Sequence, residues 1–246
     1  MSSLSAVALT GLPEVTAGDD LAALLLAGCT DAGHDLADGD VVVVSSKVVS
    51  KAAGLVARPP GRRSVRPFAA ATAALRDASV ASETVRVVAR RRTPRGLAQI
   101  VQSTAGPVMA AAGVDTSNTT PGTALLLPRD PDASARALRA ALGVGAVVIT
   151  DSWGRPWRQG QVEVAVGSAG LRVLVDHRGW PDRDGREMAA SIIAIADEVA
   201  AAADLVRKKA SGEPAVRVRG LEELVIDENQ DGAAALVRPP EDDLFR

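Results

Sequence analysis

The clearest strand signal in this chain lies in Asp38-Gly39-Asp40-Val41-Val42-Val43-Val44-Ser45-Ser46-Lys47. Its Asp-Gly-Asp start is typical of a turn, and the four consecutive valines predict a buried strand. A second apolar run, Ala146–Ile149, predicts another buried strand that leads into Thr150-Asp151-Ser152. Both strands therefore stop at polar residues whose hydroxyl, ammonium and carboxylate groups are suited to chemistry.

The remaining pattern predicts an α+β fold. Helices are expected over Asp19–Ala27, Pro67–Ala81, Ser134–Leu142 and, as the longest, Glu187–Val206. Strands are expected over Glu83–Ala89, Ala98–Gln102, Glu163–Gly167, Leu171–Asp176 and Ala215–Val218, with loops at Arg58–Arg66 and Arg90–Gly96. Because helices and strands do not alternate strictly, mixed sheets with flanking helices are favoured over a doubly wound sheet.

The composition excludes several functional classes. The 246 residues include 28 Lys and Arg against 30 Asp and Glu, so the chain lacks the basic balance of a nucleic-acid-binding domain. No apolar run approaches the roughly 20 residues of a membrane helix, and the N-terminus does not resemble a secretory signal. The single Cys29 cannot form an internal disulfide, which fits the reducing cytoplasm. With only two histidines, an oxygen-bound metal such as Mg²⁺ or Mn²⁺ is expected rather than zinc.

Asp151 is the first candidate site residue, because catalytic side chains often follow a buried strand. Its neighbours include Ser152, Arg155 and Arg158. Taken alone, the same pattern also fits a strand-end turn in which Asp151 caps the next segment. A conventional phosphate loop, G-x-x-x-x-G-K-[ST], and a complete G-x-G-x-x-G are both absent from the sequence.

Two further segments carry candidate ligands. Asp115 and Asn118 are three residues apart in a polar turn, and both are oxygen donors for a hard cation or a hydroxyl-rich ligand. An Asx turn is the alternative interpretation. Ser45-Ser46-Lys47 and Ser50-Lys51 could hold a phosphate through hydroxyl and ammonium groups, although a solvated helix start explains them as well.

Seven segments are decisive when they are taken together and in order. They are Gly11–Leu21, Asp38–Ala52, Ala112–Asn118, Leu126–Asp132, Ile149–Gly160 (ITDSWGRPWRQG), Asp182–Glu187 and Val218–Gly220. They resemble the motifs of the coenzyme F-420-0:L-glutamate ligase family, from Leu12 to about Leu221. An ordered set that covers nearly the whole chain is far more specific than any single motif, and it outweighs the turn and helix-start interpretations.

The resemblance implies one F-420 gamma-glutamyl ligase-type domain over residues 1–246, an intertwined homodimer, and GTP-dependent addition of L-glutamate to the coenzyme F-420-0 precursor. A γ-linked glutamate tail would then be extended, most simply through an acyl phosphate. It also implies a divalent metal, Mg²⁺ or Mn²⁺, with K⁺ as an optional further cation. By matching motif, Asp115 and Asp151 would ligate metal with Ser152, and Lys51 would join the two aspartates in catalysis. The implied GTP-site residues are Leu12, Pro13, Glu14, Val15, Ser46, Lys47, Lys51 and Asn118.

One departure from the family pattern lies between Leu205 and Glu213. Relatives usually carry a Gly-rich segment here, whereas this chain has Lys208-Lys209. A charged lysine can hold phosphate but cannot ligate a metal, which puts a second metal site in question. Two alternatives therefore stay open: a non-catalytic nucleotide- and deazaflavin-binding half, and a glutamate ligase for another carboxylated acceptor. The tail from Pro239 resembles the junction before the nitroreductase-like domain of two-domain relatives, and that domain is not part of this sequence.

The chain is poor in aromatic residues, with three Trp, two Phe and no Tyr. Two of the five, Trp153 and Trp157, fall inside the Asp151 motif. A flat deazaflavin ring needs a face on which to stack, so we expect these two tryptophans to contact the acceptor.

Overall fold

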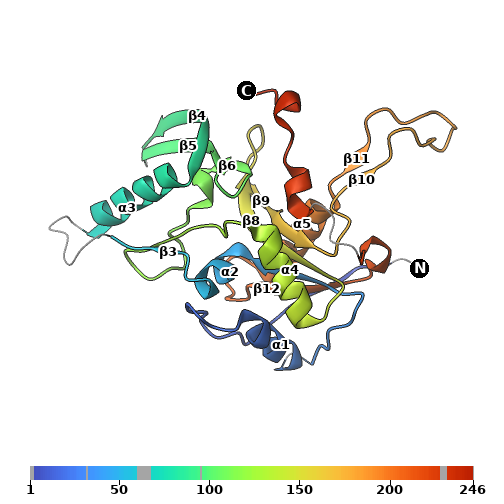
Figure 1. Ribbon diagram of the computed structural model, residues 1–246, viewed down its shortest axis with the longest axis horizontal. Helices are drawn as coiled ribbons and strands as arrows, with labels where there is room; N and C mark the ends of the chain where they lie inside the picture. Colours follow the sequence, from blue (N-terminus) through green and yellow to red (C-terminus); the bar gives the residue numbers. More distant parts are fainter. Residues whose placement is uncertain (1–2, 32, 60–67, 95, 228–231, 246) are drawn as a thin grey trace.

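A computed structural model describes residues 3–31, 33–59, 68–94, 96–227 and 232–245 (Figure 1). Its centre is a five-stranded sheet in the order β1 (Ser5–Ala8), β12 (Ala215–Arg219), β2 (Val41–Ser45), β8 (Ala146–Gly154) and β9 (Gln161–Ala169). The β2–β8 pair is parallel, and the other three pairs are antiparallel. The predicted α+β class with mixed sheets is confirmed.

The valine run forms β2 because its side chains are buried on both faces of the sheet. Val42 and Val44 pack in one hydrophobic cluster with α1 (Leu21–Asp31), α2 (Ser46–Ala52) and α4 (Pro131–Leu142). Val41 and Val43 pack in the other with α5 (Ile195–Arg207). All four valines have no exposed surface. Period-two alternation thus divides one apolar segment between two cores.

Helix α4 is fixed to the outer strand β9 by carboxylates. Asp130 caps the helix by accepting a hydrogen bond from the Ala133 N–H at 2.8 Å. The buried Asp132 accepts from the Ser168 N–H of β9 at 2.7 Å, and also from two N–H groups of η3 (Gly232–Leu236). At the start of α5, Asp197 accepts from the Ala165 N–H of β9 at 2.9 Å. The N-terminal turns of both helices are therefore bonded to the outer strand of the sheet.

Three smaller units surround this centre. A lobe consists of α3 (Phe68–Ser82), β4 (Thr84–Thr93), β5 (Gly96–Ser103), β6 (Val108–Ala110) and η1 (Ala111–Gly113). The pair β3 (Val56–Ala57) and β7 (Ala124–Leu125) lies beside α2, and β10 (Val175–Asp176) with β11 (Ile192–Ile193) forms the stem of a projecting arm (Figure 1). The short helices η2 (Glu222–Leu224) and η4 (Pro240–Asp242) complete the chain.

Several expected boundaries were wrong. The helix predicted over Glu187–Val206 begins only at Ile195, because the preceding residues form the arm and Ile192 pairs with Asp176. Consequently α3, with 15 residues, is the longest described helix. The predicted loop Arg90–Gly96 belongs mostly to the β4–β5 hairpin, and only Val175–Asp176 of the strand predicted over Leu171–Asp176 forms β10. Residues 60–66 of the predicted loop Arg58–Arg66 lie outside the described residues.

Across the described ranges, no helix has the length and apolar character needed to cross a membrane.

Candidate functional site

A cavity of about 680 Å³ lies at the carboxyl ends of the parallel strands β2 and β8. This edge of a sheet is where α/β proteins commonly bind ligands. Twenty-two residues line the cavity: Leu12, Pro13, Glu14, Val15, Ser45, Lys47, Val48, Lys51, Asn118, Thr119, Thr120, Asp151, Ser152, Glu163, Asp204, Arg207, Lys208, Lys209, Ala210, Gly212, Glu213 and Pro214. We call it the polar cavity, because charged and hydroxyl side chains predominate in it.

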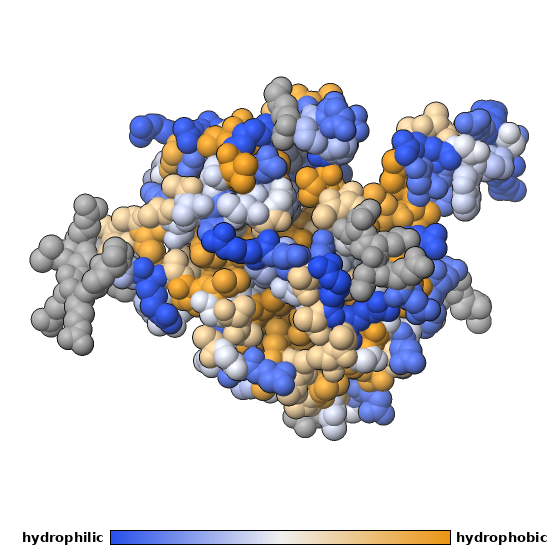
Figure 2. Space-filling view, viewed as in Figure 1, coloured by the Kyte–Doolittle hydropathy of each residue, from blue (hydrophilic) through white to orange (hydrophobic). Residues whose placement is uncertain are grey.

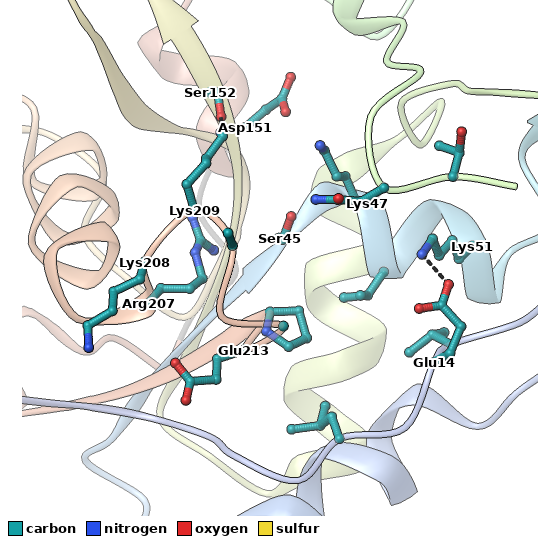
Figure 3. A pocket seen from close by; sticks show the side chains of 18 of the residues that line it. Glu14, Ser45, Lys47, Lys51, Asp151, Ser152, Arg207, Lys208, Lys209 and Glu213 are labelled. Carbon is teal, nitrogen blue, oxygen red and sulfur yellow. Dashed lines mark hydrogen bonds and ion pairs between the residues drawn. The ribbon is translucent and has the colours of Figure 1, made fainter. Parts of the chain in front are cut away.

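Helix α2 supplies two lysines to the polar cavity. It begins at Ser46 directly after β2, without a loop, so Lys47 and Lys51 are held one turn apart by a buried element. Lys47 Nζ lies 2.7 Å from Asp115 Oδ2 and 2.6 Å from Ser117 Oγ. Lys51 Nζ lies 2.5 Å from Glu14 Oε1 (Figure 3). Each lysine is thus paired with one carboxylate.

Asp151 is the most perturbed carboxyl group of the site. It lies within β8, rather than directly after the strand as expected, and its Oδ1 accepts a hydrogen bond from Ser46 Oγ at 3.3 Å. Burial and the negative charge of Glu163 raise the pKa of Asp151 from 3.8 to about 7, and Asp115 adds to the effect. The neighbouring carboxylates therefore concentrate negative charge that a bound cation would neutralise.

Glu163 and Arg207 form a buried ion pair beside Asp151. Arg207 Nη2 lies 2.7 Å from Glu163 Oε2, and the two side chains are only 7% and 6% exposed. Burial alone would raise the pKa of Glu163, but the charge of Arg207 and a hydrogen bond from Ser152 hold it below its usual range. The Ser152 hydroxyl donates to Glu163 at 2.6 Å, since the two residues are directly opposite in the β8–β9 ladder.

Lys209 contacts this group from the segment after α5. Its ammonium donates to Ser152 Oγ and lies 3.8 Å from Glu163 Oε1, while two thirds of its side chain is exposed. The preceding Lys208 has a φ of 53°, a left-handed conformation that glycine adopts more easily. Figure 3 shows Arg207–Lys209 on one side of the polar cavity, the α2 lysines on the other, and Ser45 between them.

The structure brings the predicted site residues together. Those that line the polar cavity directly are Leu12, Pro13, Glu14, Val15, Lys47, Lys51, Asn118, Asp151 and Ser152. Ser46 and Asp115 do not line it, but they contact Asp151 and Lys47, respectively. Burial opposes ionisation of Asp115, yet hydrogen bonds from Lys47 and Ser117 hold its pKa below the usual range.

Sequence reasoning missed Glu163, Arg207, Thr119 and Thr120 as site residues. Glu163 was expected only as the start of a strand, and its partner Arg207 is 44 positions away in the sequence. The register of β9 against β8 is what places Glu163 opposite Ser152. A local motif search carries no signal for such a pair.

A divalent cation fits these residues, although the described part of the chain has no cluster of three His, Cys, Asp or Glu side chains placed to hold a metal. Magnesium is commonly held by one or two carboxylates together with substrate phosphates. The oxygens available here are those of Asp151, Asp115 and Ser152. Burial and then the charge of Glu163 raise the pKa of Asp151, an effect that a bound cation would oppose.

The two tryptophans of the Asp151 motif are not in the polar cavity. Trp157 is 77% exposed and packs on Phe245, with ring centroids 5.5 Å apart. Trp153 lines a second cavity together with Phe245. Arg155 is also outside the polar cavity, because its guanidinium donates to the Gln159 and Gly160 carbonyls of its own turn.

The chain is similar to a set of known proteins. The sequence profile described as F420-0:gamma-glutamyl ligase matches residues 11–220. Two relatives are each 40% identical to this chain over 99% of its length: the coenzyme F420:L-glutamate ligases of Natronomonas pharaonis and Methanothermobacter thermautotrophicus. The matches cover 95% and 99% of these two proteins, respectively. The enzyme of the same description from Halobacterium salinarum is 38% identical, over 99% of this chain and 96% of its own.

Proposed function

This protein belongs to the F420-0:gamma-glutamyl ligase family, and on that basis we propose that it adds L-glutamate to coenzyme F420-0 with GTP as the energy source. It would then extend a γ-linked glutamate tail. The polar cavity is the observation that carries this proposal. It gathers cations on two opposite sides of a buried carboxylate, at the carboxyl ends of two parallel strands.

The lysines are the groups that we propose bind the GTP phosphates. Lys47 is paired with Asp115 and Lys51 with Glu14, so both ammonium groups are held in position at the polar cavity. A nucleotide phosphate would replace these carboxylates, because an ammonium group binds phosphate as a compact point charge. Asp115 and Glu14 would then be released, and Asp115 could turn to a cation.

We propose that Asp151, Asp115 and Ser152 hold Mg²⁺ or Mn²⁺ with the phosphates. A divalent ion there supplies Lewis-acid stabilisation of the charge that develops on a transferring phosphoryl group. Ser46 orients Asp151 through its hydroxyl, and Glu163 fixes the Ser152 hydroxyl on the opposite side. Arg207 keeps Glu163 ionised, so this carboxylate accepts from Ser152 rather than donating.

The reaction that fits this site has two steps. A carboxylate oxygen of the acceptor attacks the γ-phosphorus of GTP, the bond to the β-phosphate oxygen breaks, and an acyl phosphate and GDP form. The glutamate amine then attacks the acyl carbon, the C–O bond to phosphate breaks, and an amide, inorganic phosphate and one proton are released. Lys47 and Lys51 serve the first step by stabilising charge on the phosphoryl oxygens.

We also propose a homodimer, supported by apolar side chains exposed on the lobe. Val85, Val87, Leu97 and Ile100 on the β4–β5 hairpin are 37–64% exposed, and hydrophobic residues are visible at the surface of this lobe in Figure 2. A second copy could cover them. Light scattering should give twice the chain mass, and the Val85→Lys, Leu97→Lys double variant should give a single mass. A wild-type monomer at micromolar concentration would contradict the dimer.

Product mass tests the proposed reaction directly. Purified protein with F420-0, GTP, glutamate and Mn²⁺ should yield an acceptor one glutamyl residue heavier, with one GDP per bond formed. Asp151→Asn and Asp115→Asn should lose turnover, whereas Asp176→Asn on the exposed arm should keep it. No mass gain under these conditions would refute the ligase, and full rates in either cavity variant would refute the metal assignment.

The alternative function is a non-catalytic nucleotide- and deazaflavin-binding module. One contact favours this alternative. Lys209 donates a hydrogen bond to the Ser152 hydroxyl, and this is the same hydroxyl that we assign to the metal. Calorimetry separates the two possibilities. Binding of GTP and F420-0 without GDP formation, in the presence of glutamate and Mn²⁺, would support the module, and GDP released in step with glutamate addition would exclude it.

A further inference from the structure

The polar cavity has charged and hydroxyl walls rather than an aromatic surface for a flat acceptor. Among the described residues, those that line it include no Trp, Phe or Tyr. Its walls are suited to phosphates and carboxylates rather than to a tricyclic ring, which gains most from stacking on aromatic side chains. If the proposed function holds, the reacting carboxylate of F420-0 lies in the polar cavity and the deazaflavin ring must lie elsewhere.

A second cavity, of about 830 Å³, lies along the outer edge of β9. We call it the apolar cavity. Its walls include Trp153, Val164, Val166, Pro107, Leu236 and Phe245, which come from the central sheet, the lobe and the C-terminal segment. The size is in the range of small-molecule sites, which combine mostly apolar walls with a few polar groups. Gln102 and Arg129 are among the polar residues that line it.

Three of the five aromatic residues of the chain gather at this place. Trp153 and Phe245 line the apolar cavity, and Trp157 packs on the Phe245 ring with an interplanar angle of 31°. Phe245 is held by Arg86, which donates to the Phe245 carbonyl at 3.2 Å and to Asp243 Oδ2 at 2.8 Å. In a chain with 2% aromatic residues, this concentration marks the apolar cavity as the place for a flat ring.

The two cavities are adjacent along the β8–β9 ladder. Ser152 lines the polar cavity and the next residue, Trp153, lines the apolar one. Across the ladder, Asp151 of the polar cavity is paired with Val164 of the apolar cavity. A ligand with a ring at one end and a carboxylate at the other could therefore occupy both cavities by passing this pair.

We propose that the apolar cavity binds the deazaflavin ring of the acceptor, between Trp153 and Phe245, while the acceptor's carboxylate reaches the polar cavity. This inference rests on the proposed function for the identity of the ring. It assigns the selection of the acceptor to residues apart from those that bind GTP. Removal of the aromatic surface should therefore weaken acceptor binding and leave the nucleotide bound as before.

The probe for this test is the deazaflavin riboside, which has the ring but neither phosphate nor carboxylate. Its fluorescence should change on binding to the wild-type chain. Phe245→Ala should weaken binding about tenfold, because the variant loses one stacking surface. Ala234→Trp, at an exposed residue of the cavity wall, should block binding by filling the space. Trp180→Ala, an exposed tryptophan of the arm, is the matched control and should bind the riboside like wild type.

Calorimetry with GDP and Mn²⁺ should show equal nucleotide affinity in all four proteins. Equal riboside affinity in wild type, Phe245→Ala and Ala234→Trp would overturn the inference, as would failure of the riboside to bind a wild-type protein that elongates F420-0. If Ala234→Trp instead turned a dimer into a monomer and the riboside never bound, the occupant would be a second copy of the chain. Riboside binding that is lost in the variants, without glutamate addition by wild type, would refute the ligase and leave the ring site in place.

Discussion

Replacing Asp151 with asparagine should make the ligand-free protein more stable at pH 8 while it abolishes ligation. Burial of the Asp151 carboxyl group and the negative charges of Glu163 and Asp115 raise its pKa from 3.8 to about 7. The folded protein therefore opposes ionisation of a group that the unfolded chain ionises freely. Asparagine has nearly the same shape but no charge, so the folded variant has no unfavourable energy from an ionised group at this position.

The sign and the size of the effect on the free energy of unfolding follow from proton linkage. Below about pH 4 Asp151 is protonated in both the folded and the unfolded state, so it does not change the free energy of unfolding. Between pH 4 and pH 7 the unfolded chain loses the proton first, so wild-type stability falls as pH rises and stays lower above pH 7. A pKa displaced from 3.8 to about 7 corresponds to at most about 4 kcal/mol at about 1.4 kcal/mol per pH unit. Solvent at the polar cavity screens part of this energy, so we expect Asp151→Asn to raise the free energy of unfolding by about 2 kcal/mol at pH 8.

Thermal unfolding at pH 5 and pH 8 measures the effect. For a domain of this size, about 2 kcal/mol corresponds to a rise in Tm of roughly 4–8 °C at pH 8 and to a smaller rise at pH 5. Asp115→Asn is the matched control with the opposite sign. Because Lys47 holds the pKa of Asp115 low, that variant should lose stability at pH 8. Mn²⁺ with GDP should raise the Tm of wild type but not of Asp151→Asn.

An equal Tm difference between wild type and Asp151→Asn at both pH values would refute the electrostatic reasoning. Mn²⁺-dependent stabilisation of Asp151→Asn as large as that of wild type would refute the role of Asp151 as a metal ligand. A destabilised variant at pH 8 would show that the hydrogen bond from Ser46 outweighs the charge conflict.

Three other changes test separate parts of the structure. Lys209→Gln should raise KM for GTP about tenfold, because the ammonium that contacts Ser152 and Glu163 beside Asp151 is lost, and the effect should exceed that of Lys208→Gln at the neighbouring residue of the cavity wall; equal effects in steady-state kinetics would contradict a specific role for Lys209. Glu163→Gln removes the closer of two carboxylates paired with the buried Arg207 and leaves Asp204 at 3.6 Å, so it should lower the free energy of unfolding by about 2 kcal/mol in urea; an unchanged midpoint would count against the buried pair. Asp40 is buried and accepts from Arg219 Nε at 2.6 Å, whereas Arg219 is partly exposed; Asp40→Asn should therefore cost about 2 kcal/mol by the same assay, the worth of a charged hydrogen bond, while the exposed Asp38→Asn should cost almost nothing.

The central strands could be predicted from sequence because their pattern has one physical solution. Four consecutive valines need apolar surroundings on both sides, and β2 has them. The error at the C-terminal helix has a different cause. Met188 and Ile192 follow a helical spacing, but the Met188 N–H donates to the Trp180 carbonyl at 2.9 Å and Ile192 pairs with Asp176 in the β10–β11 ladder. A helical pattern carries no information about such pairing with earlier residues of the arm.

The candidate site likewise has a part that could be predicted from the sequence and a part that could not. Asp115, Asp151 and the α2 lysines lie in ordered motifs, and the structure places them at or beside one cavity. Glu163 and Arg207 could not be predicted, because they meet only through the β8–β9 register and the packing of α5. The two tryptophans of the Asp151 motif lie outside the polar cavity, and their expected contact with the acceptor stays a prediction. Ser152 lines the polar cavity while the next residue of the strand, Trp153, lines the second cavity, so membership of one motif does not imply membership of one cavity.

The carboxylates on the outer strand β9 have a consequence for the behaviour of the protein at high concentration. An edge strand normally offers a row of free N–H groups to which another chain can add a strand. Here Asp132 and Asp197 already accept from the N–H groups of Ser168 and Ala165. The opposite edge is the short β1, with four residues. Both edges are thus poor templates for cross-chain sheet growth, so the fold carries its own protection against aggregation through edge-to-edge pairing.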